Sequence, residues 1–243
     1  MQADGGWADS ARAWIDLIDK DPNRTLLLDP VMLRLCADVR GKRVLDVGCG
    51  EGRFCRMLAE RGASVVGIDP TALLVAEANE RCDAGHYVRA IAENEPFADA
   101  SFDLVITYVT LVDIPGYRQA IAEMARVLRP GGTLLAANLG FVTATPAAPA
   151  ESPWMRDAEG NRLFYRIDRY AEEWPATISW AGVTIHNWHR PLSAYMDAYL
   201  SSGLILREFL EPVPEDDSLR DQQAFEDWFR VPLFNVMRWE KAI

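Results

Sequence analysis

The stretch Arg43-Val-Leu-Asp-Val-Gly-Cys-Gly-Glu-Gly-Arg-Phe54 decides how the rest of the chain is interpreted. It starts with a short run of apolar and β-branched residues, 43–47, which predicts a buried strand. Glycines follow at alternate positions, and residues 54–60 have the apolar spacing of a helix. Such a glycine loop lets the backbone approach a ligand closely, and the helix N-terminus offers unpaired N–H groups. The stretch therefore predicts a ligand-binding loop.

Strands and helices alternate on both sides of this loop, which predicts an α/β protein with a mostly parallel sheet. Residues 102–107 are apolar without polar alternation, as expected of a strand covered on both faces. The predicted strands are 43–47, 64–68, 86–91, 102–107, 133–138, 204–210 and 233–240. The predicted helices are 8–20, 24–37, 54–60, 71–81, 117–128, 192–201 and 219–228.

The alternation breaks between residues 140 and 190. This segment is rich in proline and tryptophan. The prolines are at positions 146, 149, 153 and 175, and the tryptophans are at positions 154, 174, 180 and 188. Ala181-Gly182 predicts the turn of a hairpin between 176–180 and 183–187. We therefore expect 140–190 to be an inserted substrate cap on a domain built from 42–139 and 191–243, with N-terminal helices in 1–41.

Asp69 closes the second predicted strand, where a carboxylate accepts hydrogen bonds from both hydroxyls of a ribose. With the glycine loop it predicts a nucleoside-containing ligand; the alternative is an N-cap for helix 71–81. A dinucleotide fingerprint would need glycine at Arg53, which argues against NAD or FAD. Asp46 and Glu51 would repel a pyrophosphate and suit a ligand with positive charge, such as an ammonium or a sulfonium.

Four segments in order resemble class I S-adenosylmethionine-dependent methyltransferases, and most of all the small-molecule, type 11-like members. They are 44–54, 65–70, 95–106 and 122–134, and weaker similarity continues from His189 onward. The resemblance implies a Rossmann-like seven-stranded sheet with its last strand antiparallel, helices on both faces and an inserted cap. It also implies S-adenosylmethionine as cofactor and S-adenosylhomocysteine as product.

The resemblance implies cofactor roles for matched positions, from the methionine end at the glycine loop to the adenine beyond Asp69. Many relatives have Asp where this chain has Ile91, so adenine recognition is expected from Glu93 or the main chain; the alternative for Glu93 is a solvated charge. The implied cofactor-binding residues are Trp14, Arg24, Asp46, Gly48, Cys49, Gly50, Asp69, Pro70, Ala92, Glu93, Tyr108 and Thr110.

In this superfamily the N-terminal helices often fold over the cofactor. In this chain those helices contain Trp7 and Trp14. Arg24 would pair bidentately with the methionine carboxylate. Its alternative role is a surface ion pair with Asp21 or Asp29.

His189 and His186 are the catalytic candidates, since methyl transfer to a protonated hydroxyl or amine needs a base. They lie in a His-Asn-Trp-His-Arg-Pro run at the end of the predicted hairpin. The alternative is that they fix the cap to the core. Asp113 and Glu173 are further acid–base candidates, and one or two of the four cap tryptophans are expected to contact substrate.

The expected function is transfer of a methyl group to an O, N, S or C atom of a small aromatic or apolar metabolite. Two alternatives stay open: an acceptor in tRNA, rRNA or protein, and a non-catalytic cofactor-binding module. The chain of 243 residues carries 25 Lys plus Arg against 36 Asp plus Glu, a net charge of −11, which argues against nucleic acid as the main partner.

The four cysteines form no C-x-x-C pair and have no histidine at metal-ligand spacing, so we expect no metal. The start of the chain lacks signal-peptide character, and no apolar stretch approaches the ~20 residues that span a bilayer. We expect a reduced, cytoplasmic protein without a membrane partner, for which a homodimer stays open.

Overall fold

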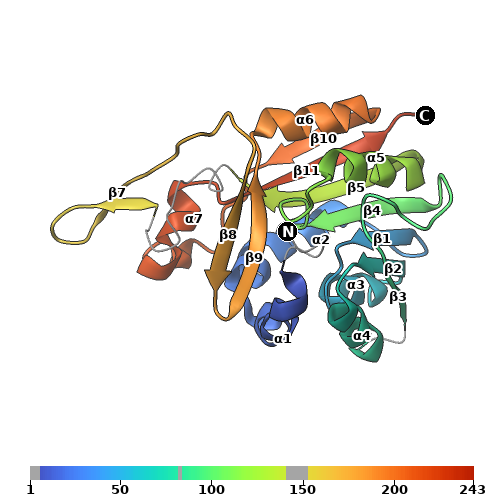
Figure 1. Ribbon diagram of the computed structural model, residues 1–243, viewed down its shortest axis with the longest axis horizontal. Coiled ribbons are helices and arrows are strands. Elements are labelled where there is room, and N and C mark those ends of the chain that lie inside the picture. The colour runs from blue at the N-terminus through green and yellow to red at the C-terminus, as the bar shows by residue number, and fades with distance from the viewer. Residues whose placement is uncertain (1–5, 82–83, 141–152) are drawn as a thin grey trace.

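A seven-stranded sheet forms the centre of the computed structural model, which describes residues 6–81, 84–140 and 153–243 (Figure 1). The strand order is β10-β11-β5-β4-β1-β2-β3, and β11 runs antiparallel to both of its neighbours. The predicted fold class is thereby confirmed. The strands are β1 Arg43–Val47, β2 Ser64–Asp69, β3 Gly85–Arg89, β4 Phe102–Tyr108, β5 Leu128–Leu139, β10 Leu204–Leu210 and β11 Phe234–Lys241.

Helices cover both faces of this sheet. The α-helices of the described chain are α1 Trp7–Leu17, α2 Asp29–Cys36, α3 Arg53–Ala59, α4 Ala72–Arg81, α5 Tyr117–Val127, α6 Leu192–Ser201 and α7 Glu226–Arg230, of which α1 packs on β9 and α4 instead of on the sheet. The predicted helix 24–37 is a π-helix, Asn23–Leu28, that runs directly into α2. The predicted helix 219–228 is wrong in its first half: 3-10 turns at Asp217–Leu219 and Gln223–Phe225 precede α7, because Leu219 and Trp228 are buried from separate turns.

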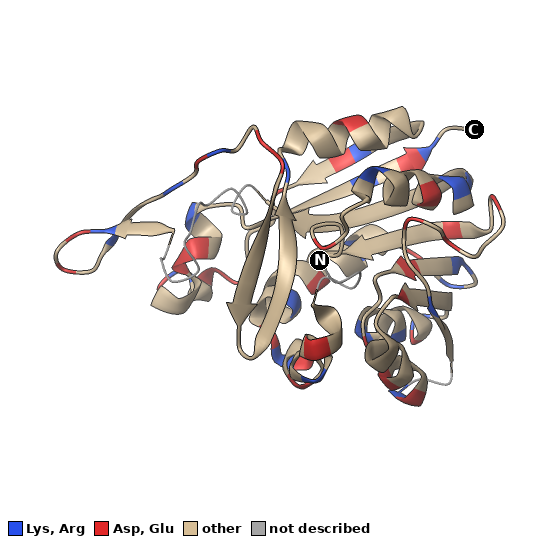
Figure 2. Ribbon diagram, viewed as in Figure 1, with Lys and Arg blue, Asp and Glu red and all other residues tan. Residues whose placement is uncertain are grey.

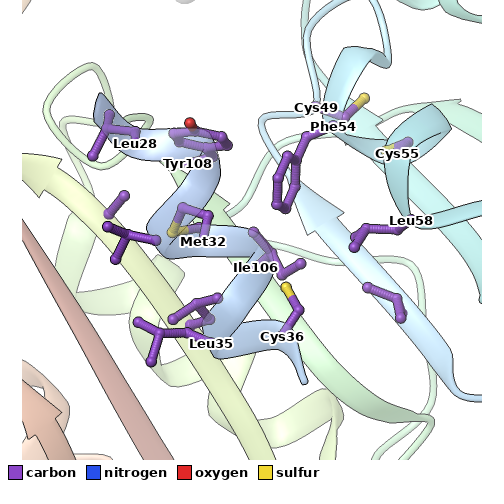
Figure 3. Packing of buried hydrophobic residues seen from close by; sticks show 14 of the residues in the cluster. Leu28, Met32, Leu35, Cys36, Cys49, Phe54, Cys55, Leu58, Ile106 and Tyr108 are labelled. Carbon is purple, nitrogen blue, oxygen red and sulfur yellow. The ribbon is translucent and has the colours of Figure 1, made fainter. Parts of the chain in front are cut away.

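The core has two parts because side chains alternate between the faces of each strand. Val44 and Ile106 point to the face covered by α2 and α3, where Met32, Phe54 and Leu58 pack (Figure 3). On the other face α5 and α6 pack against the intervening residues of the same strands. Cys36, Cys49 and Cys55 are buried free thiols, whereas Cys82 lies outside the described residues.

Two hairpins lie between β5 and α6. The predicted hairpin is confirmed: β8 Trp174–Trp180 pairs with β9 Val183–His189 through Ala181 and Gly182, whose φ values are 45° and 83°. It crosses toward α1, where Ser10 Oγ donates to the Thr184 carbonyl (2.8 Å) and accepts from its N–H (2.9 Å) (Figure 1).

The second hairpin, β6 Trp154–Arg156 with β7 Arg162–Tyr165, was not predicted from the sequence. Pro146 and Pro149 lie outside the described residues. The cap boundaries at 140 and 190 and the N-terminal unit 1–41 stay predictions.

Candidate active site

A cavity of about 390 Å³ lies at the carboxyl ends of the parallel strands. Its walls are the glycine loop after β1, the loops after β2, β3 and β4, the N-terminal helices and the β8–β9 hairpin. All twelve residues predicted to bind the cofactor line this cavity. We call the part around the glycine loop and Asp69 the cofactor half, and the part between α1 and the β8–β9 hairpin the acceptor half.

Gly48 is required by close approach as well as by backbone conformation. Its φ is +75°, and a Cβ built there would lie 2.1 Å from Thr110 Cγ2. The loop is held by the N–H groups of Gly48 and Cys49, which both donate to the Ile68 carbonyl (2.8 and 2.9 Å). The glycine loop therefore presents bare backbone to the cavity, as a ligand held by main-chain groups requires.

Val109 turns the chain at the end of β4 and brings Thr110 against the glycine loop. Its φ is +58°, a conformation that costs a β-branched residue of order 1–3 kcal/mol. Its N–H donates to the Ala137 carbonyl (2.8 Å), which holds the turn. Because Tyr108, Val109 and Thr110 all line the cavity, this backbone strain lies at the site itself.

Asp69 accepts hydrogen bonds from two backbone N–H groups, and its contact with a ribose stays a prediction. Its Oδ2 accepts from the Gly50 N–H (3.1 Å), and its Oδ1 accepts from the Thr71 N–H (2.8 Å) at the start of α4. The carboxylate therefore ties the glycine loop to the next helix while it lines the cavity. Burial raises its pKa, so a ligand that donates hydrogen bonds would favour its ionised form.

Asp46 is a buried carboxylate with one unsatisfied oxygen. Its Oδ2 accepts a hydrogen bond from Cys55 Sγ (3.3 Å), and its Oδ1 has no partner among the described residues. Burial raises its pKa to about 7. A cationic ligand beside it would stabilise the ionised carboxylate.

Glu51 differs from the expectation that its charge faces a cationic ligand. Its Oε1 lies 2.9 Å from Arg56 and 3.6 Å from Arg81. Two arginines therefore already neutralise this carboxylate, and of the three acids around the glycine loop only Asp46 and Asp69 are left to face a cationic ligand.

The predicted adenine side is formed by Pro70, Ala92 and Glu93, with Ile91 beside them. Glu93 Oε1 accepts from the Gly116 N–H (3.3 Å). Its carboxylate is thus held by the loop before α5 rather than free in solvent. Ile91 is 48% exposed and has no polar group for an adenine amino group.

Arg24 extends from the π-helix into the cavity. Its guanidinium carbon lies 4.3 Å from the centre of the Tyr108 ring, and its NH1 donates to the Tyr108 carbonyl (3.2 Å). The alternative ion pair with Asp21 is long, at 4.0 Å. Tyr108 is fixed in turn because its hydroxyl donates to Asp29 Oδ1 (2.8 Å). The guanidinium keeps donors available for an anionic group.

Neither histidine lines the cavity, in contrast to the catalytic role predicted for them. His189 is buried, with its Nε2 2.8 Å from the Tyr170 carbonyl and its ring between those of Tyr170 and Trp174. His186 Nδ1 lies 2.9 Å from Thr177 Oγ1 on the neighbouring strand. This geometry favours the alternative, in which the histidines fix the cap.

The acceptor half contains Asp113, which the sequence offered as a further acid–base candidate, and Asn187, for which the sequence reasoning gave no role. Asp113 accepts hydrogen bonds there from the side chains of both Trp7 and Asn187. The inner face of β9 carries Val183, Ile185 and Asn187. The sequence signal for Asn187 was an amide on the strand face that carries aliphatic residues at 183 and 185. Recognising this signal requires knowing which residues of the strand face inward.

One of the four cap tryptophans lines the cavity, and that residue is Trp180. Trp154 packs edge-on against Tyr165, Trp174 packs on His189, and Trp188 lies under the Arg190 guanidinium. These three belong to the packing of the hairpins.

Comparison with known proteins shows that the chain is similar to methyltransferases, the class that the sequence resemblance implies. A methyltransferase domain model matches residues 45–136. The demethylmenaquinone methyltransferase of Renibacterium salmoninarum is 30% identical over 200 residues, which cover 74% of this chain and 82% of that protein. A solved S-adenosylmethionine-dependent methyltransferase from Mesorhizobium loti is 26% identical, with a TM-score of 0.79 over 92% of this chain and 100% of that one.

A more similar but shorter match is the malonyl-[acyl-carrier protein] O-methyltransferase of Enterobacter lignolyticus. It is 42% identical over 106 residues, which are 44% of this chain and 42% of that protein. The chain thus spans about two fifths of the length of the malonyl-[acyl-carrier protein] O-methyltransferases that it matches.

The fold and the cavity define an α/β protein of the Rossmann-like methyltransferase class. The chain belongs to the class I S-adenosylmethionine-dependent methyltransferase family. S-adenosylmethionine is the family's cofactor, and the site fits it: the unsatisfied Asp46 Oδ1 in the cavity wall suits a cation. In the described part of the chain, no helix has the length and apolar character to cross a membrane.

Proposed function

We propose that this chain transfers a methyl group from S-adenosylmethionine to an O, N, S or C atom of a small, largely apolar or aromatic molecule. The observation that carries this proposal is the acceptor half of the cavity. Its wall is formed mainly by aliphatic and aromatic side chains of the hairpin and the sheet edge: Leu139, Ile178, Trp180, Ile185 and Phe234. Such a pocket suits a compact apolar acceptor held by few polar groups.

Cofactor binding is assigned to the residues of the cofactor half. Asp69 would accept hydrogen bonds from the ribose hydroxyls, and Asp46 would lie toward the cationic methionine end. Arg24 would bind the methionine carboxylate through its guanidinium. The bound cofactor supplies an electrophilic methyl group, so the protein's task is to orient the acceptor and exclude water.

The relatives support a small acceptor. One relative, of which the chain covers 82%, acts by its name on demethylmenaquinone. An aromatic acceptor of that kind matches the Trp180 and Phe234 side of the cavity.

RNA is less well supported as an acceptor, because many arginines are already ion paired. Arg126 binds Asp99 and Glu123, and Arg162 lies 3.1 Å from Glu226. Basic and acidic segments are interspersed along the helices and loops (Figure 2). A non-catalytic module is also less well supported, since Trp154 and Trp188 do not line the cavity.

The test has two stages. Isothermal titration with S-adenosylmethionine and S-adenosylhomocysteine measures binding, and absence of binding would overturn the proposal. Methyl transfer from labelled S-adenosylmethionine is then measured with phenols, hydroquinones and amines, alongside acyl-carrier protein and bulk tRNA. We expect labelling of a small phenol or hydroquinone; labelling of tRNA or acyl-carrier protein alone would overturn the assigned acceptor class.

A further inference from the structure

Asp113 presents a carboxylate to the acceptor half of the cavity, in the loop between β4 and α5. Its Oδ2 accepts a hydrogen bond from the indole N–H of Trp7 (3.1 Å), and its Oδ1 accepts one from the side-chain amide of Asn187. Trp7 belongs to α1 and Asn187 to β9. Two elements far apart in the chain therefore hold one carboxylate, and each of its oxygens keeps lone pairs for another donor.

These two donors position the carboxylate without neutralising it, since neither carries a charge. The charged groups that act on Asp113 are Arg24, which favours its ionised form, and Asp69, which opposes it. Burial outweighs both and raises the pKa of Asp113 to about 7. A group that changes protonation near neutral pH is matched to proton transfer at that pH.

We propose that Asp113 is a catalytic residue that takes a proton from a hydroxyl or amine of the acceptor, with Trp7 and Asn187 as positioning residues. This inference rests on the proposed function. For a hydroxyl acceptor, the O–H proton passes to a carboxylate oxygen of Asp113 while the oxygen forms a bond to the methyl carbon. The carbon–sulfur bond breaks and its electron pair stays on sulfur, so charge and atoms balance.

The inference narrows the class of acceptor. An acceptor that is already a carboxylate needs no base, and its charge would be repelled by ionised Asp113. The surrounding Ile178, Trp180 and Ile185 are apolar. The acceptor class is therefore a neutral, mostly apolar molecule with an O–H or N–H group, such as a phenol or hydroquinone.

The first test needs no acceptor. The indole N–H of Trp7 reports on Asp113 because the two are hydrogen bonded, and its ¹⁵N–¹H resonance is assigned by its loss in Trp7→Phe. In the ligand-free protein, we expect this resonance to titrate with a midpoint near pH 7. The titration should vanish in Asp113→Asn and persist in Asp197→Asn, an exposed control on α6. A titration that survives in Asp113→Asn, or none in the wild type, would overturn the inference.

The second test uses phenols of different acidity as acceptors. A phenol with a pKa near 10 needs a base, whereas a nitrophenol that is ionised at neutral pH does not. We expect Asp113→Asn to lower kcat about 10²–10⁴-fold for the first and less than about 10-fold for the second. Equal losses for both would make Asp113 a merely structural group.

Cofactor titration separates this inference from the proposed function. Asp113→Asn should bind S-adenosylhomocysteine within about threefold of the wild type, since the residue lies in the acceptor half. Wild type that binds no cofactor would overturn the proposed function. Wild type that binds cofactor and methylates phenols at a rate unchanged in Asp113→Asn would overturn only the role of Asp113.

Discussion

The two halves of the cavity are built in different ways. The centre of the cofactor half, the glycine loop with Asp69, is made by one continuous piece of chain, β1 to α4, in which backbone groups and Asp69 hold the loop at a spacing that the sequence displays. The acceptor half is made by α1, the loop after β4 and the β8–β9 hairpin, which meet through side chains. Under the proposed function, the cofactor shared by the family would be recognised by local backbone geometry, whereas the particular acceptor would be recognised by side chains that tertiary packing brings together.

The largest effect is expected from a substitution at Gly48, which tests whether backbone geometry determines binding in the cofactor half. Gly48→Ala adds a Cβ against Thr110 and strains a φ of +75°, so we expect cofactor affinity to fall about 100-fold or more. Isothermal titration with S-adenosylhomocysteine measures this. Gly203→Ala is the matched control, because its φ is +77° and its added Cβ meets nothing within 4 Å. Similar losses in both variants would assign the effect to backbone strain instead of to the ligand cradle.

Asp69→Ala should weaken cofactor binding 10-fold or more, because it removes hydrogen bonds to a charged acceptor worth about 1.5–3 kcal/mol. The same titration measures the loss. Asp69→Asn keeps an acceptor for the Gly50 or Thr71 N–H and separates loop support from ribose binding. Asp99→Ala, at an exposed ion pair, serves as a control. Unchanged affinity in Asp69→Ala would remove this residue from the cofactor site.

The raised pKa of Asp46 predicts that cofactor affinity depends on pH. Its pKa of about 7 means that a cationic ligand binds best once the carboxyl is ionised. We expect affinity for S-adenosylmethionine to rise up to about 10-fold between roughly pH 6 and 8. Titration across that range measures this rise. A flat profile in the wild type would contradict the prediction.

Asp46 has the opposite effect on the ligand-free protein. The folded state keeps a proton on Asp46 that the unfolded chain releases near its ordinary pKa. This contribution to stability is fully present below about pH 4 and is lost as pH rises to about 7. Asp46→Asn should remove this fall, as denaturant unfolding at several pH values would measure, and should flatten the affinity profile as well.

The smallest effects are expected at the histidines of the hairpin. His189→Ala removes a buried ring and its hydrogen bond to Tyr170, so we expect the free energy of unfolding to fall by about 1–3 kcal/mol. His186→Ala, at the partly exposed contact with Thr177, should change it by about 0.5 kcal/mol or less. Turnover per folded molecule should stay within about threefold in both. A specific loss of kcat in His189→Ala, with normal thermal stability, would restore its predicted catalytic role.

Local patterns were sufficient for the sheet, the glycine loop and the hairpin turn. At three places the local conformation is determined by neighbouring residues alone. These are the run that ends at Gly48, the end of the second strand at Asp69, and the turn at Ala181-Gly182. The resemblance to the methyltransferase family implied twelve cofactor residues, and all of them line one cavity. Those that follow β1, β2, β3 and β4 lie together because parallel strands bring their carboxyl ends to one edge.

The surroundings of individual side chains could not be predicted from the sequence, because they depend on tertiary packing. His189 is on the same buried face of β9 as Asn187, yet it packs against Tyr170 and Trp174 and does not reach the cavity. Glu51 lies in the glycine loop, but Arg56 and Arg81 neutralise it. The helix predicted over 219–228 failed for the same reason, since Leu219 and Trp228 are buried by separate turns.

The contact between Ser10 and Thr184 also fixes an order of events during biosynthesis. The two residues are 174 positions apart, and a ribosome adds about 5–20 residues per second, so roughly 9–35 s pass between their synthesis. Residues 43–81, with the glycine loop and Asp69, are complete well before β9 exists. The glycine loop and Asp69 are therefore synthesised first, and the hairpin that forms one wall of the acceptor half is added to them much later.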